Sequence, residues 1–160
     1  MKLTFKPLTA ESARQVISWR YPDDYAMYNI EIADDALVEE IAYLTDPPNH
    51  YFGIYANSEL VGHAVFHAEA RVPGGDYSED ALDVGAGMRP DWTGQGKGAN
   101  IIGAIVEFGI VHYDAKRLRA TIAAWNTRAQ KATTNNGFQE QSRFTASNSG
   151  KEFIIFIRDI

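Results

Sequence analysis

Three glycines at alternate positions, Gly94, Gly96 and Gly98, constrain this chain more than any other feature of its sequence. A strand-like run, 81–88, precedes them, and the segment 99–113 after them carries apolar residues at helical spacing. The first turn of a helix leaves about four backbone N–H groups without partners, and the helix dipole adds roughly half a positive charge. Glycines keep side chains away from these groups. The order of strand, glycines and helix therefore predicts a loop that binds phosphate through its backbone.

Several classes of protein bind phosphate in this way, and the spacing excludes three of them. A Walker loop requires Gly-Lys-Ser/Thr, whereas Lys97 is followed by Gly98. A dinucleotide-binding G-x-G-x-x-G motif is matched only loosely, and no nearby strand supplies the expected acidic residue. The HRD and DFG sets of protein kinases are missing. A flexible surface turn is the remaining alternative, and the amphipathic helix that follows argues against it.

The rest of the sequence predicts one mixed α/β domain that spans residues 1–160. Strands are expected at 2–6, 50–56, 60–68, 81–88, 117–125, 138–146 and 151–158. Helices are expected at 10–19, from Asp34 or Asp35 to about 44, at 99–113 and at 127–135. Thr9 is the expected N-cap of the first helix, Asp34 or Asp35 that of the second, and Asn136-Gly137 ends the last.

Composition excludes several kinds of partner and cofactor. The net charge of -6 argues against nucleic acid, whose phosphates favour a basic surface. Cysteine is absent, which excludes disulfides and thiolate metal sites, and the four histidines lack metal-ligand spacing, so we expect no metal. The longest apolar stretches reach about half of the roughly 20 residues of a membrane span, and no signal peptide is visible. We therefore expect a cytoplasmic protein with no membrane partner.

The segment 93–98, TGQGKG, resembles the acetyl-coenzyme-A loop of the GNAT N-acetyltransferase family, Gln/Arg-x-x-Gly-x-Gly/Ala. Thr93 stands where arginine or glutamine is usual. The resemblance extends over essentially the whole chain, through a strand before the loop and an Asn-x-x-Ala motif at Asn126, followed by Gly137-Phe138. It implies an α+β acyl-CoA N-acyltransferase fold, with a central twisted, mostly antiparallel sheet, a splayed and bulged strand pair and flanking helices. The segment 19–29 resembles bacterial family members of unassigned substrate.

The resemblance implies an acetyl-CoA-dependent N-acetyltransferase that acts on a primary amine of a small molecule or peptide, by direct attack of the amine on the thioester. Carried over residue by residue, the predicted cofactor-binding residues are Gly87, Met88, Thr93, Gly94, Gln95, Gly96, Lys97, Gly98, Ala99, Asn126 and Thr133. The alternative is a non-catalytic acyl-CoA-binding or sensory module of the same fold. Thr93 and Thr133 favour that alternative, since each departs from the family pattern.

Acetyl transfer needs a neutral amine, a donor for the thioester oxygen and a proton for the leaving thiolate. By the resemblance, amides near Gly87 and Met88 hold the carbonyl, and Asp83 is the expected general base; Asp83 can instead be a solvated strand start. Thr133 occupies the position where many family members place an acidic tyrosine, and Tyr28 is a possible substitute.

Aromatic side chains near the first helix are the expected lining of the acceptor site, and core packing is the alternative reading. They are Trp19, Tyr21, Tyr25 and Tyr28. An acidic run that ends at Asp83 is either a solvated loop or a mouth that attracts a cationic substrate. The final strands leave a homodimer possible.

Overall fold

The computed structural model describes residues 2–160, and their fold is one seven-stranded sheet flanked by helices. The strand order is β1-β2-β3-β4-β5-β7-β6. The strands are β1 (Leu3–Pro7), β2 (Tyr51–Ala56), β3 (Glu59–Phe66), β4 (Leu82–Met88), β5 (Arg117–Ala123), β6 (Gln139–Thr145) and β7 (Glu152–Asp159). The α-helices are α1 (Ala10–Ser18), α2 (Leu37–Thr45), α3 (Gly98–Tyr113) and α4 (Thr127–Thr134). The predicted mixed α/β fold is confirmed.

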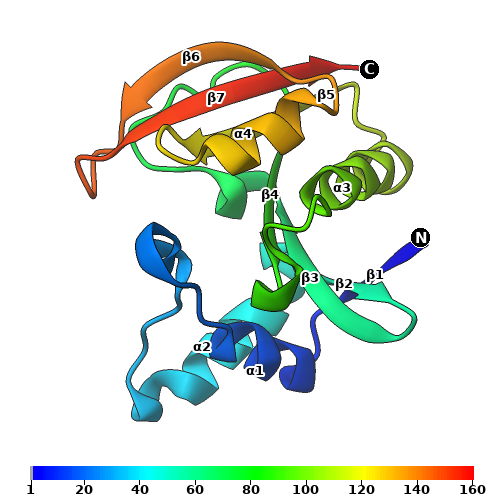
Figure 1. Cartoon of the computed structure of the whole chain (residues 1–160), viewed down its shortest axis with the longest axis vertical. Helices are drawn as coiled ribbons and strands as arrows, with labels where there is room; N and C mark the ends of the chain where they lie inside the picture. Colours follow the sequence, from blue (N-terminus) through cyan, green and yellow to red (C-terminus); the bar gives the residue numbers. More distant parts are fainter. Residues whose placement is uncertain (1) are drawn as a thin grey trace.

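Two apolar clusters hold the helices to the sheet (Figure 1). The larger cluster joins strands β1 to β5 and β7 with the apolar stripe of α3, including Ile101 and Ile105. The smaller cluster joins α1 and α2 with Trp19 and Leu60. In Figure 1, α1 and α2 lie at one end of the molecule, α4 lies under β5–β7 at the other, and β4 runs between them. The centre of the sheet is therefore where both halves of the molecule meet.

The pairing of β4 determines the shape of this centre. Every neighbouring pair of the described strands is antiparallel except β4 and β5, which are parallel. Those two strands pair only over Leu82–Val84 of β4 and Leu118–Ala120 of β5. Beyond Val84, β4 continues to Met88 without a partner on that side. The predicted splayed strand pair is confirmed.

The bulge implied for β4 is wrong. Its register with β3 runs without a shift from Val84 to Met88, and the irregularity in this region lies instead in β2, between Ile54 and Tyr55. The glycines of β4 accommodate side chains from β3. An added Cβ at Gly85 would lie 3.0 Å from Val65 Cγ1, and one at Gly87 would overlap the imidazole of His63.

Most predicted element ends lie within one residue of the observed ends; the exceptions are the start of α2, the end of β3, and the end of β5, which stops at Ala123 instead of residue 125. Thr9 caps α1 in a capping box with Ser12, as predicted for the cap. The cap predicted at Asp34 or Asp35 is wrong: a short 3-10 turn, η2 (Asp34–Ala36), leads into α2, and no side chain caps that helix. Strand β3 ends two residues early, because His67 adopts a left-handed backbone with φ of 67° and begins the 3-10 turn η4 (His67–Ala70). In residues 2–160, no helix is long and apolar enough to cross a membrane.

Candidate active site

The divergence of β4 from β5 exposes backbone groups of β4. The N–H of Arg89 donates to the carbonyl of Val61 on β3, at 2.8 Å. Because N–H directions alternate along a strand, the N–H of Gly87 also points toward β3, whereas those of Ala86 and Met88 point toward the gap beside β5. Of the two amides predicted to meet a thioester, only that of Met88 faces the gap, and Ala86 supplies a second.

The glycine loop lies between this strand and α3. Gly94 and Gly96 have left-handed backbones, with φ of 71° and 75°, which other residues rarely adopt. No side chain caps α3, and its first bond to the preceding turn is donated by Ile101 to Lys97 O. The N–H groups at the start of α3 are therefore not occupied by a cap. At Gly98 an added Cβ would lie 3.4 Å from Ala132 Cβ of α4, an ordinary contact distance, so packing alone does not require glycine there.

The other predicted loop residues make local contacts. The Thr93 hydroxyl donates to Pro90 O at 2.6 Å, and the Gln95 amide donates to Asp91 O at 2.5 Å. The Lys97 ammonium lies 4.1 Å from the ring centroid of Trp92, a cation–π contact. Ala99 follows in the first turn of α3 and is partly buried. These contacts fold the loop side chains back onto the loop, so its backbone is the part that can meet a phosphate.

Asn126 links the start of α4 to the N-terminal segment. Its Oδ1 accepts from Ala129 N–H at 3.0 Å and caps the helix, so its Nδ2 is the group that donates to Tyr28 Oη, also at 3.0 Å. The Tyr28 hydroxyl proton is therefore still available to another partner. Burial raises the pKa of Tyr28 above its ordinary value, against a lowering by the Asn126 bond. Thr133 is buried, with 1% of its surface exposed.

Asp83 lies in a buried ion pair. Its Oδ1 accepts from Arg119 Nε at 2.6 Å, and its Oδ2 accepts from both Arg119 Nη2 and Arg71 Nε at 2.8 Å. Asp83 and Arg119 are 2% and 1% exposed. The carboxylate hydrogen bond raises the pKa of Arg119. Both oxygens of Asp83 are thus occupied by guanidinium groups, an arrangement that supports structure and gives no support to the predicted base role.

The acidic run before β4 is partly neutralised in the same way. Glu79 pairs with Arg117 at 2.9 Å, and its backbone carbonyl accepts from Arg119. Asp76 accepts from Ser78. These contacts weaken the interpretation of the run as a mouth for cations, since two of its four acids already face arginines.

The predicted acceptor residues lie on a segment that bridges the splayed strands. The 3-10 turn η1 (Asp23–Tyr28) carries Tyr25 and Tyr28, and Trp19 and Tyr21 precede it. Tyr21 donates to Met88 O at 2.5 Å, and burial raises its pKa to about 12. Tyr25 packs edge-on against Trp125, with ring centroids 5.1 Å apart, and the guanidinium carbon of Arg128 lies 4.0 Å from the centroid of the Tyr25 ring.

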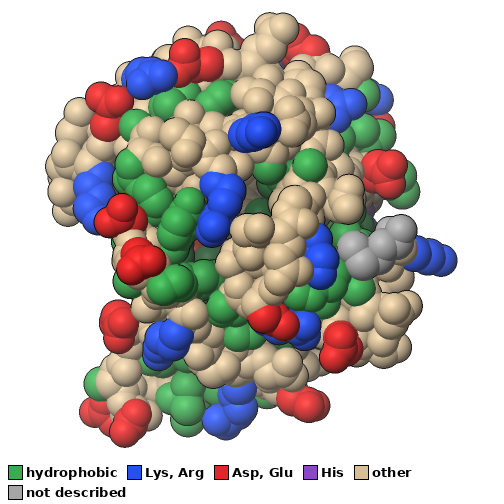
Figure 2. Space-filling model, viewed as in Figure 1, with side chains coloured by type: hydrophobic (Ala, Val, Ile, Leu, Met, Phe, Trp, Pro, Cys, Tyr) green, Lys and Arg blue, Asp and Glu red, His purple; other side chains and the backbone are tan. Residues whose placement is uncertain are grey.

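On the face in Figure 2, hydrophobic side chains flanked by charged ones gather between the strands β5–β7 and the helices α1 and α2.

Sequence reasoning assigned no role to His63, which the structure brings into this region. Its Nε2 lies against Gly87, its ring stacks on Trp19 with centroids 6.2 Å apart, and its Nδ1 is buried without a hydrogen-bond partner. Trp19 itself is 9% exposed and belongs to the smaller apolar cluster, so the packing alternative holds for this residue, while its acceptor role stays a prediction. The sequence contains one signal for this contact, a histidine on one strand that pairs with a glycine on the next. That signal can be recognised only when the register of β3 and β4 is known.

His63 also makes the stability of the fold depend on pH. Burial lowers the pKa of its imidazole from 6.5 to about 4. The unfolded chain therefore binds more protons between these pH values, and we expect stability to fall as pH decreases through them, by up to about 3 kcal/mol. Urea unfolding between pH 4.5 and 7 should show a weaker pH dependence in His63→Gln than in the wild type. Equal slopes would contradict this prediction.

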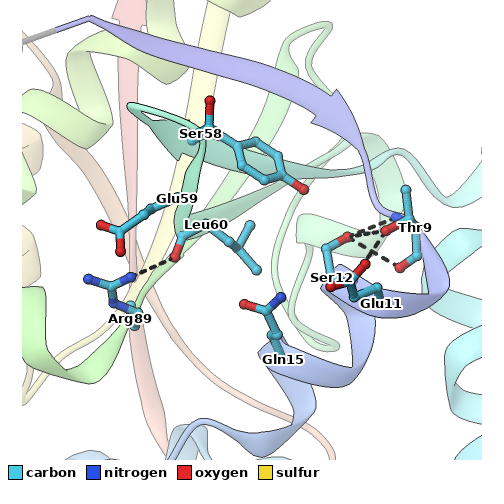
Figure 3. A pocket seen from close by; sticks show the side chains of 9 residues that line it. Thr9, Glu11, Ser12, Gln15, Ser58, Glu59, Leu60 and Arg89 are labelled. Carbon is cyan, nitrogen blue, oxygen red and sulfur yellow. Dashed lines mark hydrogen bonds between the residues drawn. The ribbon is translucent and has the colours of Figure 1, made fainter.

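A separate surface hollow shares none of the predicted site residues (Figure 3). It has a volume of 350 Å³ and lies between α1 and the turn that joins β2 to β3. On the β3 side of the hollow, Arg89 donates to Leu60 O at 3.2 Å, a bond that Figure 3 marks. In residues 2–160, no three His, Asp or Glu side chains gather closely enough to hold a metal ion.

Strand β4 has free amides where it splays from β5, and beside it α3 begins with glycines and has no cap. This arrangement is typical of proteins that bind a phosphate-bearing carrier through their backbone. The profile of the acetyltransferase (GNAT) domain matches residues 2–139. The chain belongs to the GNAT acetyltransferase family. This membership confirms the predicted acyltransferase class and the use of acetyl-CoA as cosubstrate. A search of curated protein sequences found no match.

Solved structures show the same fold at low sequence identity. A GNAT-family acetyltransferase from Bacillus anthracis is 15% identical, with a TM-score of 0.75 over 99% of this chain and 95% of its own. The aminoglycoside acetyltransferase AAC(6')-Ib, solved with ribostamycin and coenzyme A, is 14% identical, with a TM-score of 0.78 over 99% and 94%. A chimera of spermidine N-acetyltransferase SpeG from Vibrio cholerae and hSSAT is 15% identical, with a TM-score of 0.75 over 99% and 96%.

Proposed function

We propose that the protein transfers the acetyl group of acetyl-CoA to a primary amine of a small molecule, with a peptide amine as the second candidate. The observation that carries this proposal is the gap between β4 and β5, which opens beside the glycine loop. The loop backbone at 93–98 and the first turn of α3, from Gly98 through Ala99, would hold the pyrophosphate. Asn126 and the N–H groups of Ala86 and Met88 would face the acyl arm. Acetyl-CoA supplies an activated thioester carbonyl.

Residues of the N-terminal segment would receive the amine. Trp19, Tyr21, Tyr25 and Tyr28 provide aromatic surface beside the gap, which suits an amine with an apolar or sugar-like body. Two of the solved structures are named for acetyl transfer to aminoglycosides and to spermidine, both of which carry primary amines. This similarity of fold favours a small polyamine-like acceptor over a protein surface.

Acetyl transfer needs one group that donates a proton to the leaving sulfur and another that accepts a proton from the amine, and we assign these roles separately. Tyr28 keeps its proton at neutral pH and has it available, so we assign to Tyr28 the donation of a proton to the leaving sulfur. The base role of Asp83 stays a prediction; its contacts favour a role in holding β4 to β5. A cytoplasmic location and a homodimer through the final strands also stay predictions.

Calorimetry with acetyl-CoA, followed by measurement of thiol release with a panel of amines, tests the function. The panel should contain an aminoglycoside, spermidine and a peptide with a free amino terminus. We expect acetyl-CoA to bind and one of the small amines to release thiol above the rate of simple hydrolysis. Binding without release across the panel would favour the non-catalytic module. Failure of acetyl-CoA to bind would overturn the proposal.

A further inference from the structure

Amide formation needs a group that removes a proton from the attacking nitrogen, and the structure offers one that differs from Asp83. His63 on β3 lies opposite Gly87 on β4 in the antiparallel register. Its imidazole fills the space that any side chain at Gly87 would occupy, with Nε2 the nearest atom. Met88 follows Gly87 on β4; its N–H faces the gap and its carbonyl accepts from Tyr21.

The two ring nitrogens of His63 differ in their surroundings. Within residues 2–160, Nδ1 is the buried side-chain nitrogen or oxygen that has no hydrogen-bond partner. Nε2 makes no hydrogen bond to the protein either, but it is not sealed from solvent, and the residue as a whole is only partly buried. A neutral imidazole carries its proton on one nitrogen and a lone pair on the other. With the proton on Nδ1, Nε2 presents a lone pair over Gly87, on the face of β4.

The surroundings of His63 keep the imidazole neutral. Trp19 covers one side of the ring, and burial lowers the pKa to about 4 without any contribution from a charged neighbour. At neutral pH the ring is therefore uncharged and carries a lone pair on one of its nitrogens. Both oxygens of Asp83, by contrast, are already occupied by arginine guanidinium groups.

We propose that His63 Nε2 accepts the proton that the acceptor amine loses when the amide bond forms. This inference rests on the proposed function. The nitrogen lone pair forms the new C–N bond, the C–S bond breaks with its electron pair on sulfur, and the proton released by nitrogen passes to Nε2, directly or through one water. Trp19 beside the ring then lines the path of the amine, which gives that predicted acceptor residue a location next to the base.

Variants at His63 test the proposal against a packing role. We expect His63→Gln and His63→Ala to lower turnover roughly 100-fold or more, as expected for loss of a general base. Acetyl-CoA should bind both variants with the affinity of the wild type, since no predicted cofactor contact is changed. Added imidazole should restore part of the turnover of His63→Ala, because it can occupy the space vacated beside Trp19. His112→Gln, an exposed histidine on α3, is the matched control and should behave as the wild type.

A second measurement uses the protein without acetyl-CoA. The nitrogen-15 chemical shifts of His63 at pH 7 should show a protonated Nδ1 and an unprotonated Nε2. A protonated Nε2, unchanged turnover in His63→Gln, or a loss in His63→Ala that imidazole does not restore would each overturn the inference. The proposed function would survive all three results. It fails separately, if the wild type neither binds acetyl-CoA nor acetylates any amine.

Discussion

Asp83→Asn is expected to lower the free energy of unfolding by about 3–5 kcal/mol, the range found when one partner of a buried ion pair is removed. Arg119 would keep its charge with 1% of its surface exposed, and its Nε and Nη2 would face a neutral amide. Arg71 offers no relief, because it is itself a cation that loses its partner. The loss arises from the uncompensated charge of Arg119, since the shape of residue 83 hardly changes.

Urea unfolding at pH 7 measures this effect, with Asp80→Asn as the control. Asp80 is exposed and three residues away, so its neutralisation should change stability by less than 0.5 kcal/mol, on the order expected for a surface site. If Asp83→Asn does not fold, the double variant Asp83→Leu/Arg119→Met still tests the argument. Removal of both charges should recover most of the stability, because an apolar pair of similar volume avoids the desolvation of the ions. A loss below about 1 kcal/mol in the single variant would contradict the prediction.

The parts of this fold that sequence reasoning predicted depend on contacts within a few residues. The cap at Thr9 needs only a partner three residues away, and the glycine loop needs only its own backbone and the helix that follows. The hairpin of β2 and β3 is likewise local, with its turn at Asn57 and Ser58. Such elements are predictable because chain connectivity brings their partners together.

The errors and omissions concern contacts between distant segments. The glycines of β4 were read as a bulge, but Gly87 is explained by His63, on a strand whose register no local pattern specifies. The ion pair of Asp83 was missed because its partner Arg119 lies 36 residues further along the chain, and the base role of Asp83 stays a prediction. Tyr28 and Asn126 are 98 residues apart, and their bond follows from how η1 packs over the gap. Predicting such pairs requires the tertiary fold first.

Gly96→Glu is expected to weaken acetyl-CoA binding by roughly 100-fold or more, the second large effect that the structure predicts. An added Cβ at Gly96 meets no atom within 4 Å, so no steric clash at Cβ adds to the backbone strain of the substitution. The cost comes from the carboxylate, which would stand where the loop backbone and the start of α3 favour negative charge from the ligand. Calorimetry with acetyl-CoA measures the change in the dissociation constant.

The chain provides a matched control at Gly150. This glycine also has a left-handed backbone, with φ of 71° against 75° at Gly96, and an added Cβ there also meets nothing within 4 Å. Gly150 lies in the turn between β6 and β7. Gly150→Glu therefore introduces the same charge as Gly96→Glu and the same backbone strain, about 1–2 kcal/mol in each variant. If both variants lose stability equally and only Gly96→Glu loses acetyl-CoA binding, the pyrophosphate lies at the glycine loop. Equal binding by both variants would place it elsewhere, because neither strain nor net charge distinguishes the two substitutions.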